Sequence, residues 1–260
     1  MPPALAYEDK GPGTSTRVPL VLVHGHPFDR SMWNPQLAEF AADRRVIAPD
    51  LRGYGASPVT PGSVPLSRHA QDIAELLDHL EVDAFVLAGL SMGGQIAMEC
   101  YGRFGDRVRA LVLADTFPAA ETSEGGRARA AMAARLLTEG MAGYADEVLE
   151  RMVAPYAHPE VKAHVHRMMT ATSPEGAAAA LRGRAERPDY RDLLTRVRVP
   201  TLVVVGADDT YTPVSDAEAM HAALPDSRLR VIEGAAHLPN LERPKEFNEA
   251  LAELLGRLEG

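Results

Sequence analysis

The chain has 260 residues, 46% of them hydrophobic and 24% charged, which is typical of one large globular domain or of a domain with an insertion. A net charge of -9 without a dense lysine or arginine run argues against a nucleic-acid partner, and no window reaches the ~18–20 consecutive apolar residues that span a membrane. The start, MPPALAYEDKG, lacks the basic and apolar regions of a secretory signal, and the single cysteine, Cys100, cannot form an internal disulfide, so we expect a cytoplasmic protein.

Short apolar runs alternate with helical patterns along the chain. The strand-like runs span 19–25, 44–50, 84–90, 108–115, 200–206 and 229–234. Their length and nearly continuous apolarity are typical of strands buried on both faces of a parallel sheet. Amphipathic helices are predicted at 66–80, with Ser67 as N-cap, and at 243–258, with Pro244 in the first turn. This alternation predicts an α/β fold with a mostly parallel central sheet and helices on both faces.

Residues 117–197 interrupt the alternation with Ala-, Arg- and Met-rich helical stretches and no strand-like run. We interpret this segment as an all-helical cap inserted over the strand ends, which leaves 1–116 and 198–260 as the core domain. Its methionines either form a partly apolar pocket wall or pack the helices together: Met132, Met141, Met152, Met168 and Met169. The arginines are spread along the chain, and we interpret their number as compositional bias rather than as an anion site.

The sequence Gly89-Leu90-Ser91-Met92-Gly93 lies between the strand-like run 84–90 and a helix-compatible run. It fits G-x-S-x-G, a pattern in which the serine occupies a strained turn between strand and helix and exposes its hydroxyl. Side chains two residues away on either side would collide in such a turn, so both positions are small. The helix that follows brings free N–H groups and a partial positive charge to the serine.

Five segments together resemble the α/β-hydrolase family over nearly the whole chain: VLVHGHPFDRSMW, PDLRGYGAS, GLSMGG, VVVGADDTYTP and IEGAAHLPNLERP. The resemblance implies a triad with Ser91 as nucleophile, Asp209 as acid and His237 as general base, in the family's chain order. The neighbouring Asp208 is interpreted as a turn or capping residue. Asp115 is the alternative acid, because some relatives carry the acid at the end of that earlier strand.

The oxyanion hole implied by the resemblance uses the backbone N–H groups of His26, in the first segment, and of Met92, directly after the nucleophile. The His26 side chain either contacts the substrate or fills space, and we favour a substrate contact. His24 is expected to order this loop. Other prominent residues are interpreted as structural, in a loop beneath the site or in the core: Arg52, Gly53, Gly55, Trp33 and Cys100.

These residues predict a cofactor-free serine hydrolase that cleaves a small-molecule carboxylic ester or lactone through an acyl-enzyme. No His, Cys or Asp cluster has metal-ligand spacing and no G-x-G-x-x-G follows a strand, so neither a metal nor a nucleotide cofactor is expected. Ser91 argues against epoxide hydrolases and dehalogenases, which resemble this chain but use an aspartate nucleophile. Perhydrolase or haloperoxidase-type activity and C–C bond hydrolysis on the same triad stay open, as does a small-ligand receptor with a retained triad. The sequence is compatible with a monomer or a homodimer.

Overall fold

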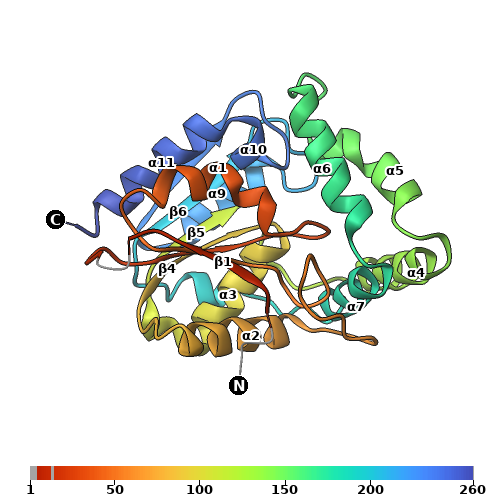
Figure 1. The fold of residues 1–260 in the computed structure, drawn as a ribbon, viewed down its shortest axis with the longest axis horizontal. Coiled ribbons are helices and arrows are strands. Elements are labelled where there is room, and N and C mark those ends of the chain that lie inside the picture. Colours follow the sequence, from red (N-terminus) through yellow and green to blue (C-terminus); the bar gives the residue numbers. More distant parts are fainter. Residues whose placement is uncertain (1–4, 13–14, 260) are drawn as a thin grey trace.

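The computed structural model describes residues 5–12 and 15–259, and a seven-stranded sheet runs through the middle of the molecule (Figure 1). The strands are β1 Tyr7–Lys10, β2 Leu20–Val23, β3 Val46–Pro49, β4 Phe85–Leu90, β5 Val108–Ala114, β6 Thr201–Gly206 and β7 Ser227–Ile232. Their order is β1-β3-β2-β4-β5-β6-β7, and every neighbouring pair is parallel except β1 and β3. The mostly parallel central sheet predicted from the sequence is therefore confirmed.

Successive residues of the central strands face two separate cores, as strands buried on both faces require. In β2, Leu20 and Leu22 contact one core, whereas Val21 and Val23 contact the other. The helices α1 (Asn34–Phe40) and α11 (Pro244–Gly256) cover the first core, and α2 (Leu66–His79), α3 (Met92–Phe104) and α9 (Val214–Ala223) cover the second. Figure 1 shows α1 and α11 above the sheet and α2 and α3 below it. The predicted α/β fold with helices on both faces is confirmed.

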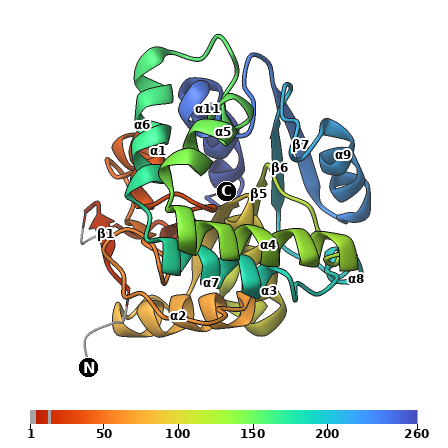
Figure 2. The same ribbon diagram turned by 90° about the vertical axis from the view of Figure 1, so that its right-hand side faces the viewer.

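Four of the helices between β5 and β6 form a layer at one end of the sheet (Figures 1 and 2). They are α4 (Ser123–Glu139), α5 (Ala142–Met152), α6 (Pro159–Ala171) and α7 (Pro174–Arg184). Helices α4 and α7 lie next to each other in Figure 2 and share a small core around Leu136 and Leu181. Residues 117–197, all of which the structure describes, contain no strand, as predicted. The division into a core and a cap at these boundaries stays a prediction.

The described residues also form short elements that connect the larger ones. Two are 3₁₀ helices, η1 (Arg30–Trp33) and η2 (Gly105–Arg107), and two are short α-helices, α8 (Arg191–Leu194) and α10 (Pro239–Glu242). No helix among the described residues has the length and apolarity needed to cross a membrane. The first four residues, part of the start for which no secretory signal is predicted, lie outside the described residues.

Two local predictions differ from the structure. The sequence does not predict β1, because its residues YEDK form no apolar run, and the strand lies at the sheet edge with half of its residues exposed. The N-cap of α2 is Pro65, whose backbone is extended (φ -69°, ψ 160°), and the helix begins at Leu66. Ser67 therefore lies inside the first turn of the helix and is not the N-cap that the sequence predicts. Pro244 is the first residue of α11, as predicted.

Candidate active site

Ser91 lies in the tight turn that joins β4 to α3. Its backbone has φ 58° and ψ -116°, a conformation that side-chain-bearing residues rarely adopt, and its N–H donates to the Ala114 carbonyl at 2.9 Å. A side chain at Gly89 would overlap the Gly93 carbonyl, and a side chain at Gly93 would overlap the Val23 carbonyl. The two glycines therefore allow the turn to close against β2, with the strained serine at its tip.

Asp209 follows β6, His237 follows β7, and the two side chains are hydrogen-bonded to each other. The His237 Nδ1 and Asp209 Oδ2 atoms are 2.7 Å apart, so the imidazole donates its Nδ1–H to the carboxylate. The backbone N–H of Tyr211 and the hydroxyl of Thr212 also donate to Asp209. Burial raises the pKa of Asp209, but the His237 charge and these hydrogen bonds outweigh burial and hold the pKa below its usual value. The ionised carboxylate thus fixes the tautomer of His237 in which Nε2 can accept a proton.

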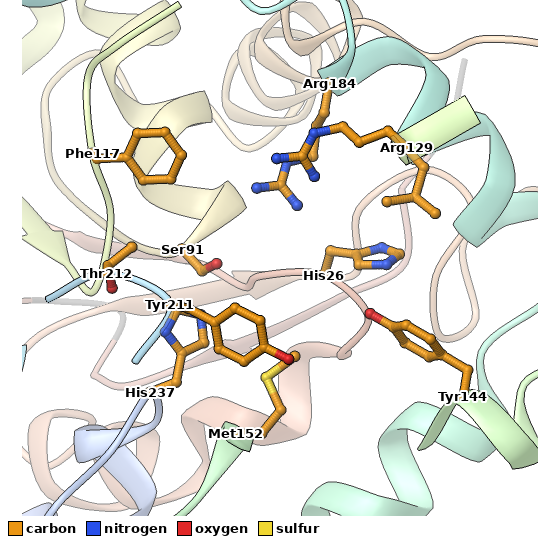
Figure 3. A pocket seen from close by; sticks show the side chains of 11 residues that line it. His26, Ser91, Phe117, Arg129, Tyr144, Met152, Arg184, Tyr211, Thr212 and His237 are labelled. Atoms are coloured by element: carbon orange, nitrogen blue, oxygen red, sulfur yellow. The ribbon is translucent and has the colours of Figure 1, made fainter. Parts of the chain in front are cut away.

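A cavity of about 230 Å³ brings Ser91 and His237 together with residues of the helical layer (Figure 3). Its walls come from the strand ends and from α4, α5 and α7: His26, Ser91, Phe117, Arg129, Tyr144, Met152, Leu181, Arg184, Tyr211, Thr212 and His237. Figure 3 shows the Ser91 hydroxyl in the middle of these side chains. Met152 is the one methionine of the five considered above that lines the cavity, whereas the other four pack among the helices.

Asp115, the alternative acid, follows β5 directly beside the acid–histidine pair. Its Oδ1 accepts the Gly206 N–H at 2.9 Å, and its Oδ2 has no hydrogen-bond partner among the described residues. Burial and the nearby Asp209 raise the pKa of Asp115 well above its usual value. The ligand atoms of Asp115, Asp209 and His237 lie within 4.8 Å of one another, and two of them, His237 Nδ1 and Asp209 Oδ2, are at the hydrogen-bond distance of 2.7 Å. The geometry therefore pairs His237 with Asp209, and the expected absence of a metal stays a prediction.

The loop after β2 passes close to the serine. A Cβ atom on Gly25 would lie 3.0 Å from the Leu90 carbonyl oxygen and 3.2 Å from the Ser91 Cβ. The next residue, His26, lines the same cavity as Ser91. Met92 is the first residue of α3, where backbone N–H groups have no partner within the helix. The two residues predicted to supply oxyanion donors thus both lie beside Ser91.

The side chain of His26 forms part of the cavity wall. Its Nδ1 lies 2.7 Å from the Tyr54 hydroxyl, and its Nε2 has no hydrogen-bond partner among the described residues. Burial, followed by the charges of Arg184 and Arg129, lowers the pKa of His26 well below its usual value, so the ring is neutral at neutral pH. A free ring nitrogen in the wall is suited to contact a bound molecule, and the predicted substrate contact stays a prediction.

Several residues interpreted as structural occupy positions that fit this role. His24 orders its loop, because its Nδ1–H donates to the Gly25 carbonyl at 2.8 Å and its Nε2 accepts the Leu51 N–H at 2.9 Å. Asp208 lies in the turn after β6, where it accepts the Tyr156 hydroxyl. Two further residues are fully buried in the cores: Trp33 and Cys100.

The sequence did not identify Arg129 and Arg184 as residues of this site. Arg129 lies on α4 and Arg184 on α7, and Figure 3 shows both guanidinium groups pointing into the cavity. The interpretation of the arginines as compositional bias gave no indication that these two line the cavity. No short motif marks them, because they meet only through the packing of α4 against α7.

Comparison with known families gives a match over most of the chain. The model of the "Alpha/beta hydrolase family" matches residues 20–250. The 3-oxoadipate enol-lactonase 2 of Acinetobacter baylyi is 30% identical over 248 residues, which cover 94% of this chain and 91% of that protein.

Solved structures of similar proteins share the same architecture. A thermophilic esterase from Thermogutta terrifontis, studied with malate bound, is 40% identical and superimposes with a TM-score of 0.95 over 98% of this chain and 94% of that chain. The enol-lactonase from Burkholderia xenovorans is 28% identical, with a TM-score of 0.88 over 97% of this chain and 96% of that chain.

Proposed function

Because this chain belongs to the alpha/beta hydrolase family, we propose that it hydrolyses a carboxylic ester or lactone with a triad of Ser91, His237 and Asp209. The observation that carries the proposal is the 2.7 Å hydrogen bond between His237 and Asp209, in a pair whose histidine lines the same cavity as Ser91. The names of the similar proteins, an enol-lactonase and an esterase among them, support the choice of substrate class.

The first half of the reaction forms an acyl-enzyme on Ser91. Nε2 of His237 accepts the hydroxyl proton as Oγ attacks the carbonyl carbon, and the Asp209 carboxylate stabilises the resulting imidazolium. The backbone N–H groups of His26 and Met92 donate to the carbonyl oxygen, where negative charge develops. The tetrahedral intermediate then expels the alkoxide, which takes the proton from His237, and the acyl group stays on Ser91.

The second half releases the acid by the same machinery. A water molecule attacks the acyl carbon while His237 accepts its proton, and the oxyanion is again held by the two backbone N–H groups. Collapse of this intermediate returns the proton to Ser91 Oγ and frees the carboxylic acid. Each proton moves through His237, so the cycle needs no metal and no organic cofactor.

We assign residues 117–197 the role of a cap over this site, with 1–116 and 198–260 as the core domain. The assignment is supported by the cavity walls, since side chains of α4, α5 and α7 face Ser91 across the cavity. The cap would therefore select the substrate, while the loops at the strand ends carry out the chemistry. A cytoplasmic location and a monomer or homodimer remain predictions.

The triad is tested by hydrolysis of p-nitrophenyl esters and lactones with three variants. Ser91→Ala and Asp209→Asn are expected to lower kcat by about 10⁴-fold or more, because they remove the nucleophile or the correct imidazole tautomer. Asp208→Asn is the matched control, because this exposed neighbour makes its side-chain hydrogen bond to Tyr156, away from His237. It should keep kcat within about twofold, as is usual for exposed positions.

Three outcomes would contradict the proposed function. They are an inert wild-type protein across the whole panel, substantial activity in Ser91→Ala, and equal losses in Asp208→Asn and Asp209→Asn. The last outcome would mean that the loop after β6, rather than the Asp209 carboxylate, is required.

A further inference from the structure

The cavity beside Ser91 carries more positive charge than the surrounding acids neutralise. Arg129 and Arg184 both line it, and Arg187 lies close to Arg184 on the chain segment that follows α7. Glu121 is the acid that pairs with this group, through Arg129 and, at 3.4 Å, through Arg187. Two of the three guanidinium groups thus share one carboxylate.

Arg184 is the arginine without a counter-ion. Among the described residues, no carboxylate oxygen lies within 4.0 Å of its guanidinium, and its Nε donates to the neutral Gln95 amide at 3.2 Å. The side chain is largely buried, since Arg184 is only 8% exposed. Its remaining N–H groups face the cavity, in which Figure 3 shows the guanidinium group above Ser91.

Arg184 nevertheless stays cationic. Burial, followed by the charges of Arg129 and Arg187, lowers its pKa to about 9, which is still above neutral pH. A buried cation without a partner is costly, and proteins as a rule compensate such a charge with an acid or a bound anion. Here the protein supplies no acid, and the open side of the guanidinium is the cavity. A negatively charged ligand bound in the cavity would therefore be the counter-ion of Arg184.

A second donor faces the same cavity. Among the described residues, the Tyr54 hydroxyl has one hydrogen-bond partner, His26 Nδ1, at 2.7 Å. We assign the phenol as the donor of this bond, which places the hydrogen of the neutral His26 ring on Nε2. That Nε2–H has no partner. The cavity thus offers a planar guanidinium and an imidazole N–H, and both are donors that suit a carboxylate.

We propose that the substrate of this site is an ester or lactone that carries a free carboxylate, which Arg184 binds with support from Arg129 and His26. The inference rests on the proposed hydrolase function and names its substrate class. The cavity of about 230 Å³ is smaller than the ~300–1,000 Å³ typical of sites for drug-sized ligands, which favours a short acid such as a half-ester of a small dicarboxylic acid.

The test compares the monomethyl and dimethyl esters of glutaric acid, which share acyl chain and leaving group and differ only in the free carboxylate. Wild type is expected to prefer the monomethyl ester in kcat/KM. In Arg184→Gln the ratio of the two kcat/KM values should fall by about 10- to 100-fold, the usual size of a charge-assisted hydrogen bond. Arg127→Gln is the matched control, because Arg127 is exposed on α4 outside the cavity, and it should leave the ratio unchanged.

The inference is overturned if wild type prefers the dimethyl ester, or if Arg184→Gln lowers both kcat/KM values by the same factor. The second result would mean that Arg184 stabilises the fold or the transition state for any ester. If Arg184→Gln does not fold, the same two esters are compared in Arg129→Gln. In that variant Glu121 keeps its ion pair with Arg187 and is not left without a partner.

Binding provides a measurement that does not depend on turnover. Calorimetric titration of glutarate into wild type should give a Kd at least tenfold lower than titration into Arg184→Gln. Equal affinity for inorganic phosphate and sulfate would contradict a carboxylate site and indicate a general anion site. If wild type hydrolyses p-nitrophenyl esters but neither glutarate ester, the substrate inference is overturned and the hydrolase function stands. If wild type is inert toward every ester and lactone, or if hydrolysis survives in Ser91→Ala, the proposed function fails, while glutarate binding that depends on Arg184 would still support the carboxylate site.

Discussion

Asp115 and Asp209 are neighbouring buried carboxyl groups whose surroundings favour different protonation states. Asp209 accepts hydrogen bonds from His237, Thr212 and the backbone of the following turn, and these donors keep its pKa low. Asp115 accepts one, from the Gly206 N–H, and burial raises its pKa. Environments that separate two pKa values in this way assign separate roles to two similar groups. Asp209 is the ionised partner of His237, and Asp115 is a neutral neighbour.

The raised pKa of Asp115 makes the stability of the protein depend on pH. An aspartate in the unfolded chain ionises near pH 3.9. Because the folded pKa is higher, the folded state binds the proton more tightly, and the free energy of unfolding decreases as pH rises from the unfolded to the folded pKa. Below the unfolded pKa both states are protonated and the cost disappears.

Asp115→Asn is therefore expected to stabilise the protein at pH 8 and to have a smaller effect at pH 4. The asparagine amide keeps the acceptor for the Gly206 N–H and cannot ionise, so the free energy of unfolding at pH 8 should increase. Tm should rise by ~2–4 °C for each kcal/mol of this increase. The measurement is thermal unfolding of wild type and variant at both pH values, with the exposed Asp106→Asn as control. A Tm that falls equally at both pH values would contradict the assignment of a neutral Asp115.

The residues of this site differ in how far the sequence could predict them. Ser91, Asp209 and His237 each follow an apolar run and belong to a short motif, so their convergence at the ends of parallel strands follows from the order of the chain. Arg129 and Arg184 lie in two Ala-rich helices without such a motif. Their convergence depends on the packing of α4 on α7, for which the sequence gives no register.

At the scale of the element, the β4–α3 turn has no space for a side chain at the glycines on either side of Ser91. Gly89 and Gly93 lie against backbone carbonyl groups, where no side chain fits, and Ser91 between them has a positive φ of 58°. Strain of this kind persists only where the neighbouring elements determine the backbone. In this turn, β2 on one side and the first turn of α3 on the other hold the serine in place.

Gly93→Ala should therefore lower both stability and activity. Its methyl group would overlap the Val23 carbonyl, and moving β2 or α3 to relieve the overlap should cost on the order of 3 kcal/mol, or ~6–12 °C in Tm. A displacement of Ser91 by about 1 Å should lower kcat about 100-fold.

Gly102→Ala is the matched control for this turn, because Gly102 lies in the same helix with its nearest neighbour, a Leu193 methyl group, at 3.6 Å. It should raise stability by up to ~1 kcal/mol through helix propensity and leave kcat unchanged. Equal Tm values and equal activities for the two variants would show that the turn is not closely packed.

The elements of the sheet were predictable to different degrees for a physical reason. The central strands are buried on both faces, so their sequences are apolar throughout and stand out from their surroundings. Strand β1 lies at an edge, pairs with β3 alone, and can therefore keep the polar residues Glu8, Asp9 and Lys10. Its presence depends on the partner strand rather than on its own pattern.

At the scale of the whole molecule, α7 attaches the helical layer to the rest of the protein. Gly176 lies against the backbone of Gly53, and Gly183 lies against the carbonyl of Val64, so the helix approaches two loops without intervening side chains. The Val64 N–H also donates to the Ala179 carbonyl of α7 at 3.0 Å. The many small residues of α7 thus serve close docking, which places Arg184 over the cavity.

Gly183→Ala tests whether this docking is required for activity. The new methyl group would overlap the Val64 carbonyl, so α7 should move away from the loop and carry the adjacent Arg184 out of position. We expect Tm to fall by several degrees and kcat/KM to fall about 100-fold, because small displacements at a binding site have effects of this size. Gly143→Ala on α5 is the control, because no atom lies within 4 Å of the added carbon, and it should behave as wild type. If Gly183→Ala lowers Tm but keeps full activity, α7 contributes to stability without positioning the cavity wall, and the helical layer would not act as a cap through this helix.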